Sequence, residues 1–376
     1  MGTDTFDTSV ADAQGIAVQP ISLKDFDVEA YADYAEELDE RCAHFWHDRK
    51  GILVCRRFRV PQVFSYACSD MELSLSLQLA ALKASMDYPM DVPNFLEPWY
   101  GIGTVAAAYG GSYIWNDGQA PAIEPLFPTV EAALEYEPLP IAETQIGRHI
   151  LAMIEYFLDK TKGKIPITFS DIQSPLNAAS GLVDTSEFFM AVLDKPELVG
   201  TLLDRVTELS IEFYEKQASL IGGLRASPGH GFSSSRSFSG IGVSDDSSTM
   251  LSPSQYRTLV APRMERFGNA FGGIVYHSCG NWSSKIEAVK AMKGLLMVDG
   301  AFTVQTDPSP NPPEVFRDQF RGSGICVNSR MVGDSDSVWV ALSRLWDPDM
   351  KIILVTYCAT PEEQKELYDR IQGEVR

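Results

Sequence analysis

Short apolar runs rich in β-branched residues alternate with amphipathic stretches from about residue 50 onward, and this alternation constrains the fold more than any other feature. Runs that are apolar along their whole length indicate strands buried on both faces, as in a parallel sheet covered by helices. We predict eight such strands, at 51–58, 92–96, 165–169, 229–233, 274–277, 295–299, 324–328 and 351–357. Eight strand–helix units favour a (β/α)8 barrel over an open doubly wound sheet.

The intervening helices have recognisable signals at their first turns. Asp194 is a candidate cap for a helix with Pro196 in its first turn, followed by apolar residues at steps of three, four or seven. Ser252-Pro253-Ser254-Gln255 has the pattern of a capping box, and Thr360-Pro361-Glu362-Glu363 repeats the device near the C-terminus. Helices are therefore expected to begin soon after strands end.

No low-complexity linker divides the 376 residues. We expect residues 51–376 to form one barrel and residues 1–50 to form an N-terminal helical extension packed on it. That extension contains a C-x-H-x-x-H cluster at 42–47, in which Phe45 and Trp46 are interspersed. The mixture predicts the packing face of an amphipathic helix rather than a metal site.

Charge and hydropathy exclude two classes of partner. Asp and Glu number 51 against 31 Lys and Arg, a net charge of −20 that disfavours nucleic-acid binding. No apolar run reaches the roughly 18 residues of a membrane helix, and the first residues lack the features of a signal peptide. We therefore expect a cytoplasmic protein without membrane contact, whose oligomeric state stays open.

The most informative motif is His277-Ser278-Cys279-Gly280 at the end of a predicted strand. Side chains two residues apart on a strand point the same way, so His277 and Cys279 can reach one ion, and Gly280 lets the backbone turn away. The pair is half of a tetrahedral zinc site. A packed histidine beside a buried thiol is the alternative interpretation.

Cys358 strengthens the metal interpretation. It follows the strand KIILVTY and precedes the capped helix at Thr360, which places it on the same rim of a barrel as the His-x-Cys pair. The fourth position could be filled by Asp245, by Asp246, or by water or substrate. Cys326 lies within a predicted strand, where a buried structural thiol is expected.

Four stretches carry a family resemblance: EPWYGIGTVAAAYGGSYIWNDGQAPAIEP at 97–125, SEFFMAVLDKPELVGTLLDRVTE at 186–208, SDDSSTMLSPSQYRTLVAPRMERF at 244–267 and HSCGNW at 277–282. They resemble the uroporphyrinogen decarboxylase superfamily over about residues 90 to 370. The resemblance implies the (β/α)8 barrel that the strand pattern predicts.

Decarboxylases of this superfamily carry an Arg-rich motif resembling RQAGRY that grips substrate carboxylates, and a Phe-Ser-Asp element that holds pyrrole nitrogens. Here VCRRFRV at 54–60 occupies the region of the first without its motif. FLEPW stands in place of the second, leaving Glu97 as a substitute. Porphyrinogen decarboxylation is not expected, although a metal-free decarboxylase-like or tetrapyrrole-binding role is the alternative function.

The other branch comprises zinc-dependent methyltransferases that move a methyl group between a corrinoid protein and a thiol or a folate. Its metal is held by a His-x-Cys pair and by a Cys near the C-terminus that precedes a Thr-Pro helix start. His277, Cys279 and Cys358 fit that arrangement. The resemblance thus implies Zn2+, a corrinoid (methylcobalamin) supplied by a partner protein, and a small-molecule methyl acceptor, with Asp245, Asp246 and Glu97 as catalytic candidates.

Further residues near the predicted rim are weaker candidates. Gly101-x-Gly103-x-x-Ala106 imitates a dinucleotide fingerprint, but too few residues follow for a full crossover helix, so a rim loop is expected. Trp99 and Tyr100 precede it and are candidate substrate contacts. His230, beside the serine-rich run FSSSRSFSG, is a third candidate contact, whereas His149 is expected to be structural or solvated.

Overall fold

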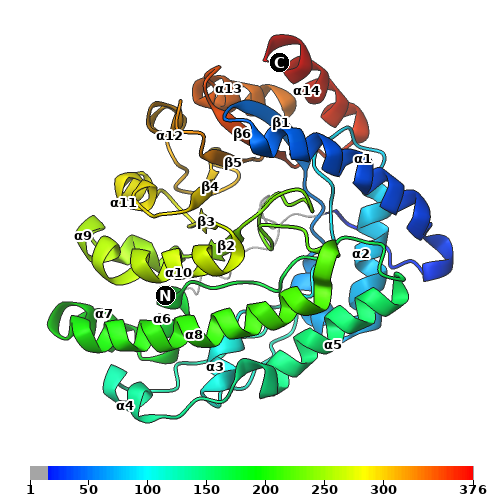
Figure 1. Cartoon of the computed structure of the whole chain (residues 1–376). Coiled ribbons are helices and arrows are strands. Elements are labelled where there is room, and N and C mark those ends of the chain that lie inside the picture. Colours follow the sequence, from blue (N-terminus) through cyan, green and yellow to red (C-terminus); the bar gives the residue numbers. More distant parts are fainter. Residues whose placement is uncertain (1–15, 376) are drawn as a thin grey trace.

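The computed structural model describes residues 16–375, in which helices surround a parallel β-sheet (Figure 1). Six regular strands form the sheet, in the order β1-β6-β5-β4-β3-β2, and every neighbouring pair is parallel. Their bounds are β1 (Gly51–Arg56), β2 (Ile241–Ser244), β3 (Ile274–His277), β4 (Leu295–Ala301), β5 (Cys326–Met331) and β6 (Lys351–Thr356).

Irregular segments continue the wall beyond β2. Leu96 forms a parallel bridge with Ile167, and Ile167 forms another with Arg225. The chain just after Arg225 reaches β2, because the Gly242 amide donates to the Pro228 carbonyl at 2.9 Å. The predicted strands at 92–96 and 165–169 therefore occupy wall positions as single bridges rather than as regular strands.

Asp91 connects this irregular side to β1. Its amide donates to the Val54 carbonyl at 2.7 Å, and its carboxylate accepts from the Val54 amide at 2.8 Å. Hydrogen bonds thus lead from β2 through the irregular segments back to β1, as a barrel requires. The architecture is α/β, of the (β/α)8 barrel type, as the strand pattern predicts.

The predicted strand at 229–233 is wrong, because these residues form turns. The backbone φ of Gly229 is 126° and that of Gly231 is 87°, values that a strand does not adopt. Phe232 instead enters the barrel interior against Gly242, where a Cβ would lie 2.2 Å from the Phe232 ring. The next regular strand in the sequence is β2 (Ile241–Ser244).

Helices cover the outside of the sheet (Figure 1). Those of the first half are α2 (Met71–Ser85), α3 (Thr104–Ala108), α4 (Val130–Glu135), α5 (Gln145–Lys160), α6 (Pro175–Leu182), α7 (Thr185–Asp194) and α8 (Pro196–Ile221). Those of the second half are α9 (Pro253–Gln255), α10 (Ala261–Phe271), α11 (Ile286–Lys290), α12 (Pro313–Phe320), α13 (Ser335–Leu345) and α14 (Pro361–Glu374). No described helix is long and apolar enough to cross a membrane.

The predicted caps are confirmed at two of three positions. Ser252 forms the complete capping box with Gln255, and the Thr360 side chain accepts from the Glu363 amide. The Asp194 cap is wrong, since Asp194 is the last residue of α7 and Lys195 precedes α8. An N-cap needs non-helical backbone, which Asp194 does not have.

The N-terminal helix α1 (Val28–His47) lies at the amino ends of the strands. The Lys351 ammonium at the start of β6 donates to the Trp46 carbonyl at 2.8 Å. Cys42 and Phe45 are buried in one cluster with side chains from the barrel interior, whereas His44 and His47 are exposed. Of the predicted extension, residues 1–15 lie outside the described residues, and α1 packs on the barrel through Cys42 and Phe45. The carboxyl ends of the strands remain available for a site.

Candidate metal centre

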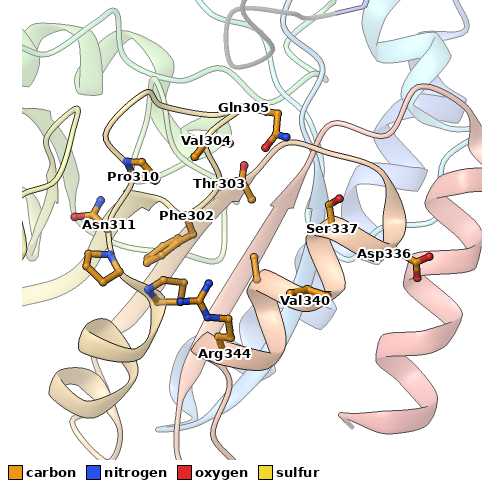
Figure 2. Close-up of a pocket in the computed structure, with 13 residues that line it drawn as sticks. Phe302, Thr303, Val304, Gln305, Pro310, Asn311, Asp336, Ser337, Val340 and Arg344 are labelled. Atoms are coloured by element: carbon orange, nitrogen blue, oxygen red, sulfur yellow. The ribbon is translucent and has the colours of Figure 1, made fainter.

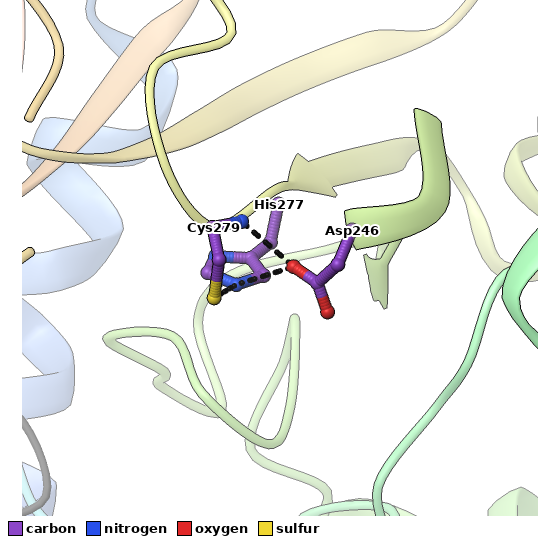
Figure 3. A group of neighbouring side chains, drawn as sticks. All are labelled: Asp246, His277 and Cys279. Carbon is purple, nitrogen blue, oxygen red and sulfur yellow. Dashed lines mark hydrogen bonds and ion pairs between the residues drawn. The ribbon is translucent and has the colours of Figure 1, made fainter. Parts of the chain in front are cut away.

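Asp246, His277 and Cys279 gather where two neighbouring strands end (Figure 3). His277 is the last residue of β3, and Asp246 follows β2 by two residues. One ligand atom from each residue lies within 4.8 Å of the other two. His277 Nε2 is 3.4 Å from Cys279 Sγ and 3.5 Å from Asp246 Oδ1.

These separations suit one zinc ion. A tetrahedral ion with bonds of about 2.0 Å to nitrogen and oxygen and about 2.3 Å to sulfur holds its ligand atoms about 3.3 to 3.6 Å apart. The measured 3.4 and 3.5 Å fall within that range. Imidazole nitrogen, thiolate sulfur and carboxylate oxygen are also the donors that zinc accepts in proteins.

A buried carboxylate fixes the orientation of the His277 ring. His277 Nδ1 lies 2.6 Å from Asp299 Oδ2, and Asp299 also accepts from Asn328 Nδ2 at 2.5 Å and Arg330 Nε at 3.0 Å. Burial raises the pKa of Asp299, but Arg330 and His277 outweigh it and lower the pKa to about 2. An ionised carboxylate only accepts, so Nδ1 donates and Nε2 points toward the proposed ion.

The two ligand side chains influence each other electrostatically. Burial lowers the pKa of His277, but the neighbouring Cys279, Asp246 and Asp299 outweigh burial and raise it. Burial likewise raises the pKa of Asp246, and His277 outweighs it and lowers that pKa. Without a metal, a proton on Nε2 therefore offsets the negative groups, and a bound cation would replace it.

The turn after His277 is held by the loop that follows β4. The Gly280 amide donates to Asp307 Oδ2 at 2.8 Å, and Asn311 Nδ2 donates to the Gly280 carbonyl at 3.2 Å. Gly280 has a φ of 69°, which accounts for glycine at this position. The Cys279 amide donates to Asp246 Oδ1 at 2.7 Å, and this hydrogen bond holds the Asp246 carboxylate against the turn.

The same loop borders a cavity of about 560 Å3, which lies between it and α13 (Figure 2). Asn311 lines the cavity, so one side chain contacts both the cavity and the metal-site turn. Val304 and Val340 are more than half exposed on its two sides. The rim beside the candidate metal centre is therefore partly apolar.

Of the two predicted carboxylates, only Asp246 reaches the His-x-Cys pair. Asp245 is fully buried, and its Oδ1 accepts from Ser174 Oγ at 2.5 Å. Burial raises its pKa to about 7. The sequence could not distinguish the two neighbours, because successive side chains diverge and only the fold determines which one faces the site.

Cys358 is not part of the group of described residues within 4.8 Å. It is 1% exposed, and its carbonyl accepts from Arg56 Nε at 2.8 Å. Burial raises the pKa of its thiol to about 12, with Glu363 adding to the effect. Its role as a ligand stays a prediction, and Asp246 takes its place beside the pair in this structure.

A second polar cluster joins Glu97, Asp171 and His230. His230 Nδ1 lies 2.5 Å from Glu97 Oε2, and His230 Nε2 lies 3.2 Å from Asp171 Oδ2. Trp99 Nε1 also donates to Asp171 Oδ2 at 3.2 Å. Burial raises the pKa of Glu97, but His230 and Arg57 outweigh it and lower it to about 2. The structure thus brings together three predicted site residues, Glu97, Trp99 and His230.

Sequence reasoning missed Asp171, although a signal was present. Phe169-Ser170-Asp171 is itself a Phe-Ser-Asp triplet, and it begins at the last residue of the predicted strand 165–169. Asp171 was missed because the family resemblance suggested the Phe-Ser-Asp element one predicted strand earlier, at FLEPW. Tyr100 does not join this cluster and lies in an aromatic group beside His149.

Two arginines of VCRRFRV, Arg56 and Arg57, form contacts within the fold. Arg56 is buried and donates to the Arg57 and Cys358 carbonyls. Arg57 donates to the Gly231 carbonyl and pairs with Glu97 at 3.7 Å. These contacts occupy guanidinium groups that a polycarboxylate would otherwise use.

Residues 56–222 match the family model of uroporphyrinogen decarboxylase (URO-D). This match covers 167 of the 376 residues, so this part of the chain is similar to that family. The fold of the chain is similar to the solved structure of a methyltransferase from Methanosarcina mazei, with a TM-score of 0.55 and 16% sequence identity over 97% of this chain and 96% of that chain. At this identity the likeness shows the fold. No curated protein sequence matches the chain.

The expected barrel type is thereby confirmed, and residues 56–222 show the similarity to uroporphyrinogen decarboxylases that the sequence analysis expects. Active sites of (β/α)8 barrel enzymes lie at the carboxyl ends of the strands. Both polar clusters of this chain follow the carboxyl ends of wall segments, at β2 and β3 for one and at the bridges of Leu96 and Ile167 for the other.

Proposed function

We propose that this protein is a zinc-dependent methyltransferase that moves a methyl group between a corrinoid protein and a thiol or folate acceptor. One observation carries the proposal: Asp246, His277 and Cys279 present oxygen, nitrogen and sulfur atoms at zinc-ligand separations, and Asp299 orients the imidazole. A methyltransferase of similar fold is consistent with this reaction class.

The residues of the site have separate tasks in this proposal. His277 Nε2, Cys279 Sγ and Asp246 Oδ1 would hold the ion, and Cys358 or the acceptor would supply a fourth ligand. When bound, zinc keeps an acceptor thiol as the thiolate at neutral pH, which is the nucleophilic form. Asp299 stabilises the charge on the His277 side and prevents the ring from rotating.

Proton balance gives Glu97, Asp171 and His230 a task. A thiol that accepts a methyl group loses its S–H proton, which must pass to a base or to water. The two carboxylates and the imidazole form a continuous chain of hydrogen bonds beside Trp99. We assign Glu97 and His230 to acceptor binding and proton transfer, with Trp99 as an apolar contact.

The partner in this proposal is a corrinoid protein that covers the barrel mouth. Large apolar side chains are exposed on the loops after four wall segments, at 53% to 67% of their surface: Tyr66, Ile102, Met250 and Val304. Exposed apolar groups on several loops of one rim are typical of a protein-interaction surface.

Transfer assays with free methylcobalamin in place of the partner test this function. Zinc-loaded protein should methylate a simple thiol or tetrahydrofolate, and Cys279→Ser should lower the rate by at least about 100-fold because it removes a soft ligand. Equal rates for the zinc-loaded protein, the chelator-treated protein and Cys279→Ser would overturn the proposal.

A further inference from the structure

A separate cavity of about 320 Å3 lies between the Gly101–Trp115 region and the start of α5. Three aromatic side chains, Tyr100, Tyr113 and Trp115, line it, and Arg148 from α5 lies at its edge. The rings contact one another at centroid distances of 5.4 to 5.9 Å. The proposed metal centre uses none of these residues.

The glycines that imitate a dinucleotide fingerprint have a definite task here. A Cβ at Gly101 would lie 2.6 Å from the Tyr113 Oη, and a Cβ at Gly103 would lie 2.7 Å from Tyr113 Cε1. Tyr113 Oη donates to the Tyr100 carbonyl at 2.5 Å and accepts from the Gly103 amide at 3.0 Å. The two glycines thus allow the Tyr113 ring to lie flat on the loop and to be fixed there.

Tyr100 is also held from behind. The His149 ring stacks on it at 3.8 Å with an interplanar angle of 25°. Burial lowers the pKa of His149, so the imidazole is neutral at pH 7, and its Nε2 lies 3.1 Å from the Cys68 carbonyl. A neutral ring in this contact donates its Nε2–H to the carbonyl. The aromatic wall is therefore rigid on the side away from the cavity.

Trp115 completes the wall but remains accessible. Its side chain is 42% exposed, although it lies 5.9 Å from both tyrosine rings. Indole is a large apolar ring, and its exposure to water is unfavourable. A planar ligand that stacks on Trp115 would bury the ring and gain this free energy.

Arg148 gives the cavity a cationic edge in a chain of net charge −20. The guanidinium is exposed and donates to the Glu143 backbone carbonyl. No carboxylate of residues 16–375 lies within 4.0 Å of it as an ion pair, although Glu143 also lines the cavity. A guanidinium that forms no ion pair with the described residues, and that lines a cavity together with aromatic rings, is suited to a carboxylate on a planar ligand.

We propose that this cavity binds a planar aromatic ring that bears a carboxylate. The ring lies against Trp115 and the two tyrosines, and the carboxylate meets Arg148. The site does not depend on the proposed metal, because none of its lining residues contacts Asp246, His277 or Cys279 in the described contacts.

Calorimetric titration with three matched probes tests the ligand class. We expect 2-naphthoate to bind, and 2-naphthamide and cyclohexanecarboxylate to bind at least about tenfold more weakly, because each lacks one of the two recognised groups. Equal affinity for 2-naphthamide would remove the carboxylate from the proposal. Equal affinity for cyclohexanecarboxylate would remove the aromatic ring.

Variants locate the site. Trp115→Ala and Arg148→Gln should each weaken 2-naphthoate binding at least about tenfold, whereas Trp339→Ala, Arg321→Gln and Cys279→Ser should leave it unchanged. Trp115 and Arg148 are both accessible, and unchanged melting midpoints would show that both variants fold. Loss of binding in Cys279→Ser with full binding in Trp115→Ala would place the probe at the metal centre and overturn the proposal without affecting the methyltransferase assignment.

Discussion

Asp299 accepts hydrogen bonds from His277, Asn328 and Arg330 at once, and its ionised form keeps Nδ1 of His277 protonated. Asp299→Asn replaces an obligate acceptor with an amide that can also donate, so the imidazole loses its fixed orientation. We expect zinc affinity to fall about 10- to 100-fold, measured by competition with a chromogenic chelator. Asp336→Asn on the exposed start of α13 is the matched control, and equal affinity in both variants would contradict the role of Asp299.

Glu97 should make the free energy of unfolding depend on pH in the acidic range. Its pKa is about 2 in the folded protein against an ordinary value of 4.5, so the unfolded chain binds more protons between these pH values. The contribution to the free energy of unfolding is complete above pH 4.5 and is lost as the pH falls toward 2. A shift of this size corresponds to about 3 kcal/mol.

Glu97→Gln should remove this contribution, because the neutral amide no longer forms an ion pair with His230 and Arg57. We expect urea unfolding to show a loss of roughly 3 kcal/mol at pH 7 that shrinks as the pH approaches 2. A variant whose deficit is independent of pH would show that Glu97 is not ionised in the fold.

At the scale of elements, the regular half of the barrel could be predicted closely. β3 has the predicted bounds, and β6 differs by one residue, because their apolar runs are continuous. The segment 229–233 shows the limit, since Phe232 is as buried as a strand residue but the glycines beside it turn the chain. Apolar pattern alone cannot separate these two cases.

In the site, too, contacts between residues close in sequence could be predicted, whereas contacts between distant strands could not. The spacing of His277 and Cys279 is local, so the sequence predicted that they lie together. The choice of Asp246 over Asp245, and the contacts of Asp299 and Asp171, depend on packing between strands that are distant in sequence. Local patterns carry no information on the contacts of Asp246 and Asp299, whereas the Phe-Ser-Asp triplet at 169–171 is a local signal for Asp171.

Cys326 and Cys358 lie on neighbouring strands and allow a predicted metal ligand to be compared with a thiol of the core. Cys326 is the first residue of β5, fully buried near the floor of the barrel, whereas Cys358 follows the end of β6. Burial raises the pKa of the Cys326 thiol to about 12. We expect Cys326→Ser to lower the free energy of unfolding by roughly 1 to 3 kcal/mol, as a buried hydroxyl needs a partner, with zinc content unchanged.

Cys358→Ser should instead lower zinc content and activity sharply, because a hydroxyl replaces a soft thiolate ligand. Zinc by emission spectroscopy and melting midpoints with and without a chelator measure both variants. Full zinc occupancy in Cys358→Ser would leave Asp246 as the third protein ligand, and loss of zinc in Cys326→Ser alone would contradict the assignment of Cys326 to the core.

At the scale of the whole molecule, a net charge of −20 and the internal contacts of Arg56 and Arg57 disfavour polyanionic substrates. Uroporphyrinogen carries several carboxylates and needs arginines to offset their desolvation. We expect no carbon dioxide release from it at an enzyme-like rate. Release at about 1 per second or faster would contradict this expectation.

Elemental analysis of protein purified without added metal tests the central claim, the metal centre at Asp246, His277 and Cys279, most directly. The wild-type protein should contain close to one zinc ion per chain, and Cys279→Ser, whose exposed side chain is not needed for folding, should contain almost none. Wild-type protein without zinc, or Cys279→Ser with as much zinc as the wild type, would contradict the assignment.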